Sequence, residues 1–325
     1  MRRILRLSVT VLTIVVSGVY LYVNRDSLGL LLEVRPCHLV IITALTFLTF
    51  VSSGVIFALL VRIVGVRLTA VETVGLSLVT SMGNYLGPLR PGAALKAVYL
   101  KSYRQLPYAH FMTVLSANAF LLLLMTGLSG LVVLSLIEPP DAVTGLLLFL
   151  VCLFLVAGSA LPFVVRLPRV AGTGRLTSVL RSALEGFGII GRKQGRLLLT
   201  CAVIVLQFLL SAVVYQYAYN AMGLSLSFVS ATAIGVFAAM SNFFTITPNN
   251  LAIQEAVVAY MITVAGFDFV TGAMGATLLR LVHVVLTFAL APLFTHLLMR
   301  RAPVASGRNP PGGPGHSRRE PRKAI

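Results

Sequence analysis

The pattern SMGNY at residues 81–85, followed by Pro91, occurs a second time as AMSNF at residues 239–243, followed by Pro248. Each copy interrupts a stretch that is too long and too apolar to be an element of a soluble core. Each is followed by a second apolar, helix-like run. Broken helices at corresponding places in two halves of a membrane protein are the best sequence indication of a substrate site. The repeat therefore predicts a membrane protein that binds a ligand within the bilayer.

The composition also indicates a membrane protein. The 325 residues are 58% hydrophobic and 11% charged, with a mean hydropathy of +0.94, whereas soluble domains have about 25% charged residues. Residues 40–60 carry no charge, and about 20 apolar residues span a bilayer. The net charge of +17 lies mainly between the apolar runs and in the basic tail. That placement argues against a nucleic-acid partner.

Six long apolar runs and two pairs of shorter runs divide the sequence. The first long run is interpreted as an uncleaved span, because no small-x-small cleavage site precedes Asn24. The long runs cover about 4–23, 38–61, 107–137, 142–165, 197–222 and 270–299. The shorter runs pair as 70–87 with 91–103, and 226–247 with 250–266. We therefore expect an all-α polytopic membrane protein with about eight membrane segments, including two broken or re-entrant helix pairs.

Charged residues predict the topology. If each short pair returns to the side from which it starts, 23 of the 26 Lys and Arg residues fall on one side. The opposite side carries Asp26, Glu33, Glu138, Asp141 and Asp268. Because Lys and Arg are enriched on the cytoplasmic side, we expect a multi-pass protein of the plasma (inner) membrane with both termini in the cytoplasm.

The two short pairs then start from opposite sides of the membrane, which predicts an inverted repeat. Each pair can be a re-entrant hairpin or two full crossings, and the charge pattern fits both. The transmembrane domain is expected over residues 1–301, with halves at about 1–165 and 197–301. Residues 175–193 predict an amphipathic cytoplasmic helix between them, or else an ordinary basic linker. Residues 302–325 predict a disordered basic cytoplasmic tail.

An ion pair is predicted inside the membrane in the second half. Arg280 lies near the middle of the last long run, where a charge costs about 2.5–3.5 kcal/mol, so it should face the interior and have a partner. Glu255 is the expected counter-ion. The pair either serves an anionic headgroup or is structural, and both interpretations stay open. His283 and Asn118 are expected to make structural hydrogen bonds.

The two breaks supply groups that suit an anion. Pro248, Asn249 and Asn250 end one helix and can cap the next, and the free N–H groups at a helix start favour anions. Residues 89–92 (LRPG) have the same place in the first half, with Lys96 one turn further on. The predicted substrate-binding residues are Asn84, Arg90, Pro91, Lys96, Asn242, Pro248, Asn249, Asn250, Glu255 and Arg280.

No enzyme motif is present in the sequence. G-x-S-x-G, H-E-x-x-H, the P-loop and the dinucleotide fingerprint are all missing, and the nine acidic residues show no paired-carboxylate pattern. Cys37, Cys152 and Cys201 are too far apart in sequence to indicate a zinc site or a disulfide framework. We therefore expect no catalytic residue, metal or cofactor, although an intramembrane transferase would need none of these motifs.

At these residues the chain resembles the lysylphosphatidylglycerol synthase transmembrane-region family, also called flippase-like. One motif of that family has the form N-x-x-x-P-x-R-x-G-E-x-x-R, and its counterpart here runs from Asn84 to Lys96. Another has the form T-P-G-G/N-L-G-x-R/Q-E-A, which residues 247–256 (TPNNLAIQEA) fit well, and Arg280 matches a following intramembrane Arg. The resemblance covers about residues 10–300.

The chain departs from the family pattern mainly in its first half. The family Glu and Arg of the motif in that half are Ala93 and Lys96 here, and a Glu–Arg pair usual in the next span is missing, with Asn118 nearby. In the second half, two family glycines are replaced by Asn249 and Ala252. The departures in the first half imply a different headgroup or a loss of activity.

The resemblance implies movement of lipids or lipid-linked intermediates between leaflets. Full-length synthases add a soluble aminoacyl-transferase domain, for which this chain leaves no room after Arg300, so lipid aminoacylation is not expected. We expect an anionic phospholipid or a polyprenyl-phosphate-linked lipid as the substrate. The alternative is a non-transporting accessory or catalytic membrane subunit of polysaccharide or glycolipid biosynthesis, acting with an envelope-biosynthesis glycosyltransferase.

Overall fold

The structure, a computed structural model, describes residues 34–85, 91–137, 141–164, 193–243 and 247–300. All regular structure in these residues is helical, and five helices are long and apolar enough to cross a membrane. They are α3 (Pro36–Ile63), α6 (Tyr108–Leu134), α7 (Ala142–Val164), α9 (Gln194–Ala221) and α12 (Phe269–Arg300). These helices match five of the six predicted long runs, which confirms the all-α polytopic fold. The run at 4–23, the linker at 175–193 and the tail at 302–325 lie outside the described residues.

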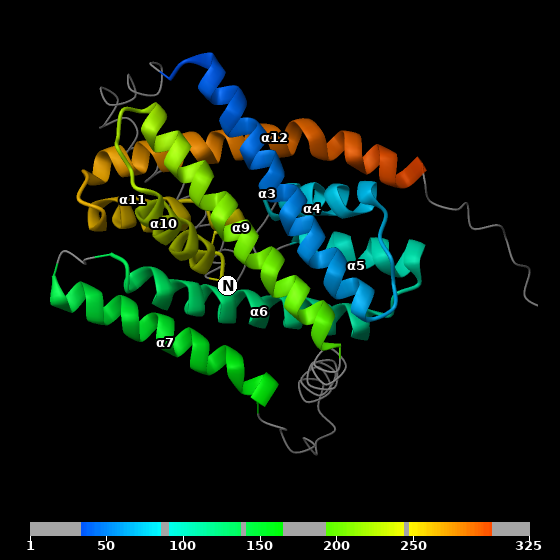
Figure 1. Cartoon of the computed structure of the whole chain (residues 1–325). Helices are drawn as coiled ribbons and strands as arrows, with labels where there is room; N and C mark the ends of the chain where they lie inside the picture. The colour runs from blue at the N-terminus through cyan, green and yellow to red at the C-terminus, as the bar shows by residue number, and fades with distance from the viewer. Residues whose placement is uncertain (1–33, 86–90, 138–140, 165–192, 244–246, 301–325) are drawn as a thin grey trace, which may run out of the picture.

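The outer faces of the long helices carry exposed apolar side chains. Phe154 on α7 is 75% exposed, Leu198 on α9 is 70% exposed and Val40 on α3 is 69% exposed. Exposed apolar surface of this extent marks a face that another apolar phase covers. Figure 1 shows α7 beside α6 at the edge of the bundle, where most of its surface points outward. The apolar side chains are therefore distributed as expected for helices surrounded by lipid.

Four shorter helices form two hairpins between the long ones. The first hairpin joins α4 (Ala70–Tyr85) to α5 (Pro91–Arg104). The second joins α10 (Phe228–Ser241), through the 3-10 turn η2 (Pro248–Asn250), to α11 (Ile253–Val264). These helices have 12 to 16 residues, so at 1.5 Å per residue they are about 18–24 Å long, shorter than the roughly 30 Å hydrocarbon core. Of the two arrangements compatible with the charges, the lengths favour re-entrant hairpins.

The two halves show the same pattern of helix contacts, so they are related by an approximate two-fold symmetry. Helices α3, α4, α5 and α6 correspond to α9, α10, α11 and α12, and their contacts form matching sets. Helix α4 packs against α12 as α10 packs against α6, and α3 packs against α12 as α9 packs against α6. Each half thus places its first hairpin helix against the last helix of the other half.

The corresponding helices α3 and α9 lie side by side and run antiparallel (Figure 1). At one end, Arg196 Nη1 at the start of α9 donates to the carbonyl oxygen of Arg62 at the end of α3 (2.9 Å). At the other, His38 Nδ1 lies 2.8 Å from the hydroxyl oxygen of Tyr217. A symmetry that reverses helix direction in this way is the inverted repeat that the sequence predicted.

Helices α4 and α5 approach closely because a glycine lies at their contact. A Cβ atom on Gly92 would lie 1.9 Å from the carbonyl oxygen of Thr80 on α4. Any larger residue would therefore separate the two helices. Close backbone approach through small residues is a general way for helices to pack in membranes, where lipid removes the hydrophobic drive for association.

An ion-pair network fixes the open end of the first hairpin. Glu72 on α4 accepts hydrogen bonds from Arg104 Nε (2.8 Å), the Tyr99 hydroxyl (2.9 Å) and the Thr69 backbone N–H (2.8 Å). Burial raises the pKa of Glu72, but the bonds from Arg104, Thr69 and Tyr99 outweigh burial and hold this pKa at about 2. The last residue of α5 is thereby tied to the first turn of α4.

Candidate functional site

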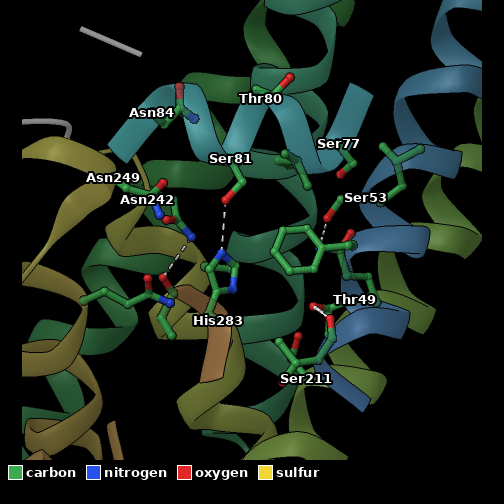
Figure 2. Close-up of a pocket in the computed structure, with 18 of the residues that line it drawn as sticks. Thr49, Ser53, Ser77, Thr80, Ser81, Asn84, Ser211, Asn242, Asn249 and His283 are labelled. Atoms are coloured by element: carbon green, nitrogen blue, oxygen red, sulfur yellow. Dashed lines mark hydrogen bonds between the residues drawn. The ribbon is translucent and has the colours of Figure 1, made fainter. Parts of the chain in front are cut away.

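A polar cavity of about 450 Å³ lies between the two halves. Both halves contribute to its wall, and Figure 2 shows side chains from several helices converging on it. Its neutral hydrogen-bonding residues are Thr46, Thr49, Ser53, Ser77, Thr80, Ser81, Asn84, Asn118, Gln207, Ser211, Tyr215, Asn242, Asn249 and Gln254. Polar groups inside membrane segments usually face a protein interior or a water-filled cavity and mark substrate pathways. The cavity is therefore the candidate substrate site.

The second break is an irregular turn held by a buried asparagine. Asn249, Asn250 and Ala252 have φ angles of 44°, 61° and 66°, in the left-handed region that asparagine tolerates better than most residues. The buried Asn250 amide donates to the carbonyl oxygen (2.7 Å) and the hydroxyl oxygen (3.0 Å) of Ser241. These bonds tie the turn to the end of α10, and Asn249 then lines the cavity.

The first break is capped in a comparable way. Asn84 lines the cavity near the end of α4, and its Oδ1 accepts a hydrogen bond from the Gly92 backbone N–H (3.2 Å) at the start of α5. Pro91 is the first residue of α5, where its missing N–H leaves no donor unsatisfied. Arg90 lies outside the described residues. Helix α4, which ends just before the first break, contacts η2 of the second break.

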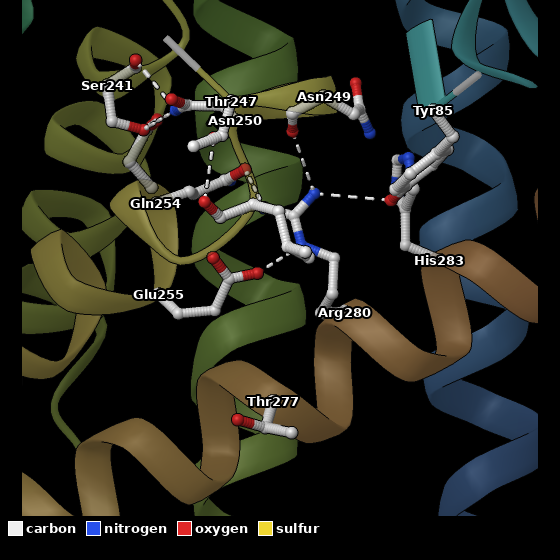
Figure 3. A network of polar contacts seen from close by, with 12 residues as sticks. Tyr85, Ser241, Thr247, Asn249, Asn250, Gln254, Glu255, Thr277, Arg280 and His283 are labelled. Carbon is white, nitrogen blue, oxygen red and sulfur yellow. Dashed lines mark hydrogen bonds and ion pairs between the residues drawn. The ribbon is translucent and has the colours of Figure 1, made fainter. Parts of the chain in front are cut away.

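Arg280 lies at the centre of a network that joins both breaks (Figure 3). Its Nε forms the predicted ion pair with Glu255. Its Nη2 donates to Gln254 Oε1 (2.8 Å), and its Nη1 donates to the Tyr85 hydroxyl (3.3 Å) and the Asn249 carbonyl oxygen (3.4 Å). All three guanidinium nitrogens therefore have partners, which come from α4, η2 and α11. The network spans the interface of the two halves.

Lys96 is the second cation of the cavity, and its environment is different. It lies on α5, and its Nζ is 3.9 Å from the centre of the Phe57 ring on α3. Within the described ranges, its ammonium group has no carboxylate or hydrogen-bond partner. A cation–π contact of this kind contributes about 0.5–2 kcal/mol but leaves the N–H donors free. Among the described lining residues, one cation therefore has a counter-ion and one does not.

Six predicted residues line the cavity. They are Asn84, Lys96, Asn242, Asn249, Glu255 and Arg280. Pro91, Pro248 and Asn250 belong to the breaks and lie outside the lining. His283 makes the expected structural contact, with Nε2 at 3.2 Å from Ser81 Oγ (Figure 2), and it also lines the cavity.

Three further residues of the site were not among the predicted ones: Gln254 and Gln207, which line the cavity, and Tyr85, which accepts a hydrogen bond from Arg280. Tyr85 follows Asn84 in the repeated pattern and Gln254 precedes Glu255, so adjacency to predicted residues was the available signal. Gln207, whose Nε2 donates to Ser53 Oγ (3.0 Å), lies within an apolar run and had no signal beyond being an isolated polar residue. Its position became apparent only when α9 was placed against α3.

The helical bundle and its apolar outer faces define a multi-pass integral membrane protein, with a polar cavity between two inverted halves. The family model for the lysylphosphatidylglycerol synthase TM region matches residues 4–291. The chain therefore belongs to this family, as its motifs indicated. A comparison with curated proteins gave no match.

Proposed function

We propose that this protein binds the headgroup of an anionic lipid, or of a lipid-linked intermediate, in the central cavity and passes it between leaflets. The observation that best supports this proposal is a polar cavity with an excess of positive charge between two inverted halves. Transporters built from inverted repeats bind substrate at the repeat interface near the bilayer midplane. Rocking of one half against the other then opens the site to each side in turn.

The charges of the cavity favour an anion. Lys96 and Arg280 contribute two positive charges, and Glu255 contributes one negative charge. Helices α5 and α11 also begin at the breaks, and helix starts attract negative charge through their free N–H groups and the helix dipole. We therefore propose an anionic phospholipid or a polyprenyl-phosphate-linked lipid as the partner. The proposed cycle contains no covalent step.

The proposed location is the plasma (inner) membrane, with both termini in the cytoplasm. Arg62 at the end of α3 and Arg196 at the start of α9 lie at the same end of the bundle. This placement supports a common basic side, which in membrane proteins is the cytoplasmic side.

The proposal is tested by lipid translocation in liposomes that contain the purified protein. The panel includes fluorescent anionic, zwitterionic and polyprenyl-phosphate lipids, and a membrane-impermeant quencher reports their transfer. Headgroup-selective transfer is expected, with loss in Arg280→Ala and retention in Arg300→Ala, which removes an exposed arginine at the end of the same helix. No transfer of any lipid by well-folded protein would refute transport and favour the accessory or catalytic role in envelope biosynthesis.

Water access to the cavity gives a second test of the proposal. Cysteines placed at Asn84 and Asn249, which both line the cavity, should react with a small aqueous thiol reagent. A cysteine at Leu121, which is buried in the core, is the matched control and should stay protected. Complete protection of the two cavity cysteines in folded protein would contradict a water-accessible substrate site.

A further inference from the structure

We propose that the cavity is selective for a monoanionic phosphodiester with a hydroxyl-rich headgroup, and that the phosphate binds at Lys96 rather than at Arg280. This inference rests on the proposed function and names the substrate class of the same site. Four features of the cavity support it: the engagement of Arg280, the free ammonium of Lys96, the charge balance, and the distribution of hydroxyl groups.

Arg280 is already engaged by the protein. Glu255 neutralises its charge, and Gln254, Tyr85 and Asn249 accept hydrogen bonds from its other two nitrogens. A phosphate at Arg280 would have to displace these partners and would leave the Glu255 carboxylate close to a second anion. Like charges in a poorly solvated site repel strongly. Arg280 therefore acts as the link between the two breaks.

Lys96 offers what Arg280 lacks. Its ammonium has three N–H donors and, in the part of the chain that the structure describes, interacts only with the Phe57 ring. The start of α5 adds to this preference. Ala93 is the third residue of α5, as Glu255 is the third residue of α11, and both line the cavity. The Glu255 carboxylate offsets the positive end of the helix dipole of α11, whereas Ala93 leaves the start of α5 without a negative charge. The start of α5 therefore attracts an anion.

The charge balance limits the ligand to one negative charge. The Arg280–Glu255 pair is neutral as a unit, which leaves Lys96 as the single uncompensated charge among the described lining residues, with His283 counted as neutral. Buried charges are tolerated when they are paired. One phosphodiester balances Lys96, whereas a phosphomonoester or a pyrophosphate would bring excess negative charge into the cavity.

The remaining wall fits hydroxyl groups better than an ammonium group. Ser53, Ser77 and Ser211 line the cavity (Figure 2), and the hydroxyl groups of Ser77 and Ser211 form no hydrogen bond among the described residues. Glu255 is the one carboxylate in the described lining, and it is held by Arg280. A cationic headgroup would therefore find no free anion, whereas a polyol would find donors and acceptors.

Three soluble probes separate these properties. Glycerophosphoinositol is a monoanionic phosphodiester with a polyol, glycerophosphocholine is a zwitterion, and glycerol 3-phosphate is a phosphomonoester. Each is titrated into the purified protein in detergent micelles, and the rise of the unfolding midpoint with probe concentration gives the half-saturating concentration. We expect glycerophosphoinositol to saturate at the lowest concentration of the three.

Two pairs of variants locate the binding groups. Lys96→Gln should raise the half-saturating concentration of glycerophosphoinositol by about tenfold or more, the usual effect of losing a charged hydrogen bond. Lys101→Gln, at an exposed lysine over the Tyr108 ring, should leave it unchanged. Ser211→Ala, which removes a hydroxyl group of the cavity wall, should raise it about two- to tenfold. Ser52→Ala, which removes a buried hydroxyl that lies outside the cavity and has no partner among the described residues, should not.

The outcomes separate the inference from the proposed function. Equal binding of glycerophosphocholine, or undiminished binding by folded Lys96→Gln, would overturn the inference even if the protein transfers lipid between leaflets. Selective binding that depends on Lys96, in a protein that transfers no lipid, would refute transport and leave the assignment of the site intact. Binding that is lost equally in Lys96→Gln and Lys101→Gln would show a surface charge effect and would also overturn the inference.

Discussion

Removal of both charges from the Arg280–Glu255 pair is expected to destabilise the protein by less than the sum of the losses that follow removal of each charge alone. The side chain of Arg280 is 13% exposed and that of Glu255 is 16% exposed. Glu255→Gln keeps the shape of the side chain but leaves the guanidinium without a counter-ion. Arg280→Met removes the charge and all hydrogen bonds that the guanidinium donates, but keeps an apolar stem. The double variant contains neither charge.

The burial of the pair sets the magnitude of this effect. Removing one partner of a buried ion pair costs about 3–5 kcal/mol, because the remaining charge stays buried without compensation. We expect each single variant to lose stability in this range. The double variant should lose less than the sum of the two single variants, with an interaction energy of up to about 3 kcal/mol. The bond that Arg280 makes to Tyr85 across the interface, and its bond to Asn249 within the second half, would be lost in both Arg280 variants.

Reversible unfolding in mixed detergent–SDS micelles would give the four free energies of the double-mutant cycle. The exposed Arg300 at the end of α12 provides the control, since Arg300→Met should change stability by no more than about 0.5 kcal/mol. If the two single-variant losses simply add in the double variant, the pair does not couple energetically. The interpretation of Arg280 and Glu255 as a buried, mutually compensating ion pair would then be refuted.

Three further predictions concern the hairpins. Gly92→Ala should destabilise the protein by about 1–3 kcal/mol, since the new Cβ would lie 1.9 Å from the Thr80 carbonyl oxygen. The control is Gly158→Ala, whose Cβ would meet no described atom within 4 Å. This control variant should be neutral or stabilising in the same unfolding assay. Ala252→Gly should stabilise the second break by about 1 kcal/mol, because φ is 66° there; a lower unfolding midpoint would contradict this. Glu72 has a pKa near 2, lowered from 4.5. Its contribution to stability is therefore complete above about pH 4.5 and is lost as the pH falls towards 2. If the unfolding midpoint of a Glu72→Gln variant depends on acid pH as that of the unmodified protein does, this prediction is refuted.

The membrane segments could be predicted because their signals are local. A run such as 38–61 is long and uncharged, so only a spanning helix satisfies its backbone in lipid, and α3 is found at Pro36–Ile63. The two hairpins could be located because Pro91 and Pro248 interrupt apolar runs that should otherwise continue. Whether those pairs span the membrane could not be decided from charge, because both arrangements return to the same side.

Part of the cavity could also be predicted. An arginine in the middle of an apolar run needs a partner, so Arg280 and Glu255 could be paired in advance. Tyr85 and Gln254 could not be assigned to the same network, since their bonds to Arg280 depend on how α4 and η2 approach α12. The hydroxyl groups of Thr46 and Ser53 gave no signal, because threonine and serine within a membrane helix usually bond to their own backbone.

The sequence by itself determined the helices, the places where they break and the inverted order of the two halves, because the cost of unpaired backbone and buried charge in lipid acts on each segment separately. The tertiary structure alone decided which polar groups face one another. Gln207 meets Ser53 because α9 lies antiparallel to α3. Lys96 lies over Phe57 without a counter-ion in the described structure, because α5 and this part of α3 belong to the same hydrophobic cluster. Such contacts depend on the angle and register of helices far apart in the chain, which no local pattern encodes.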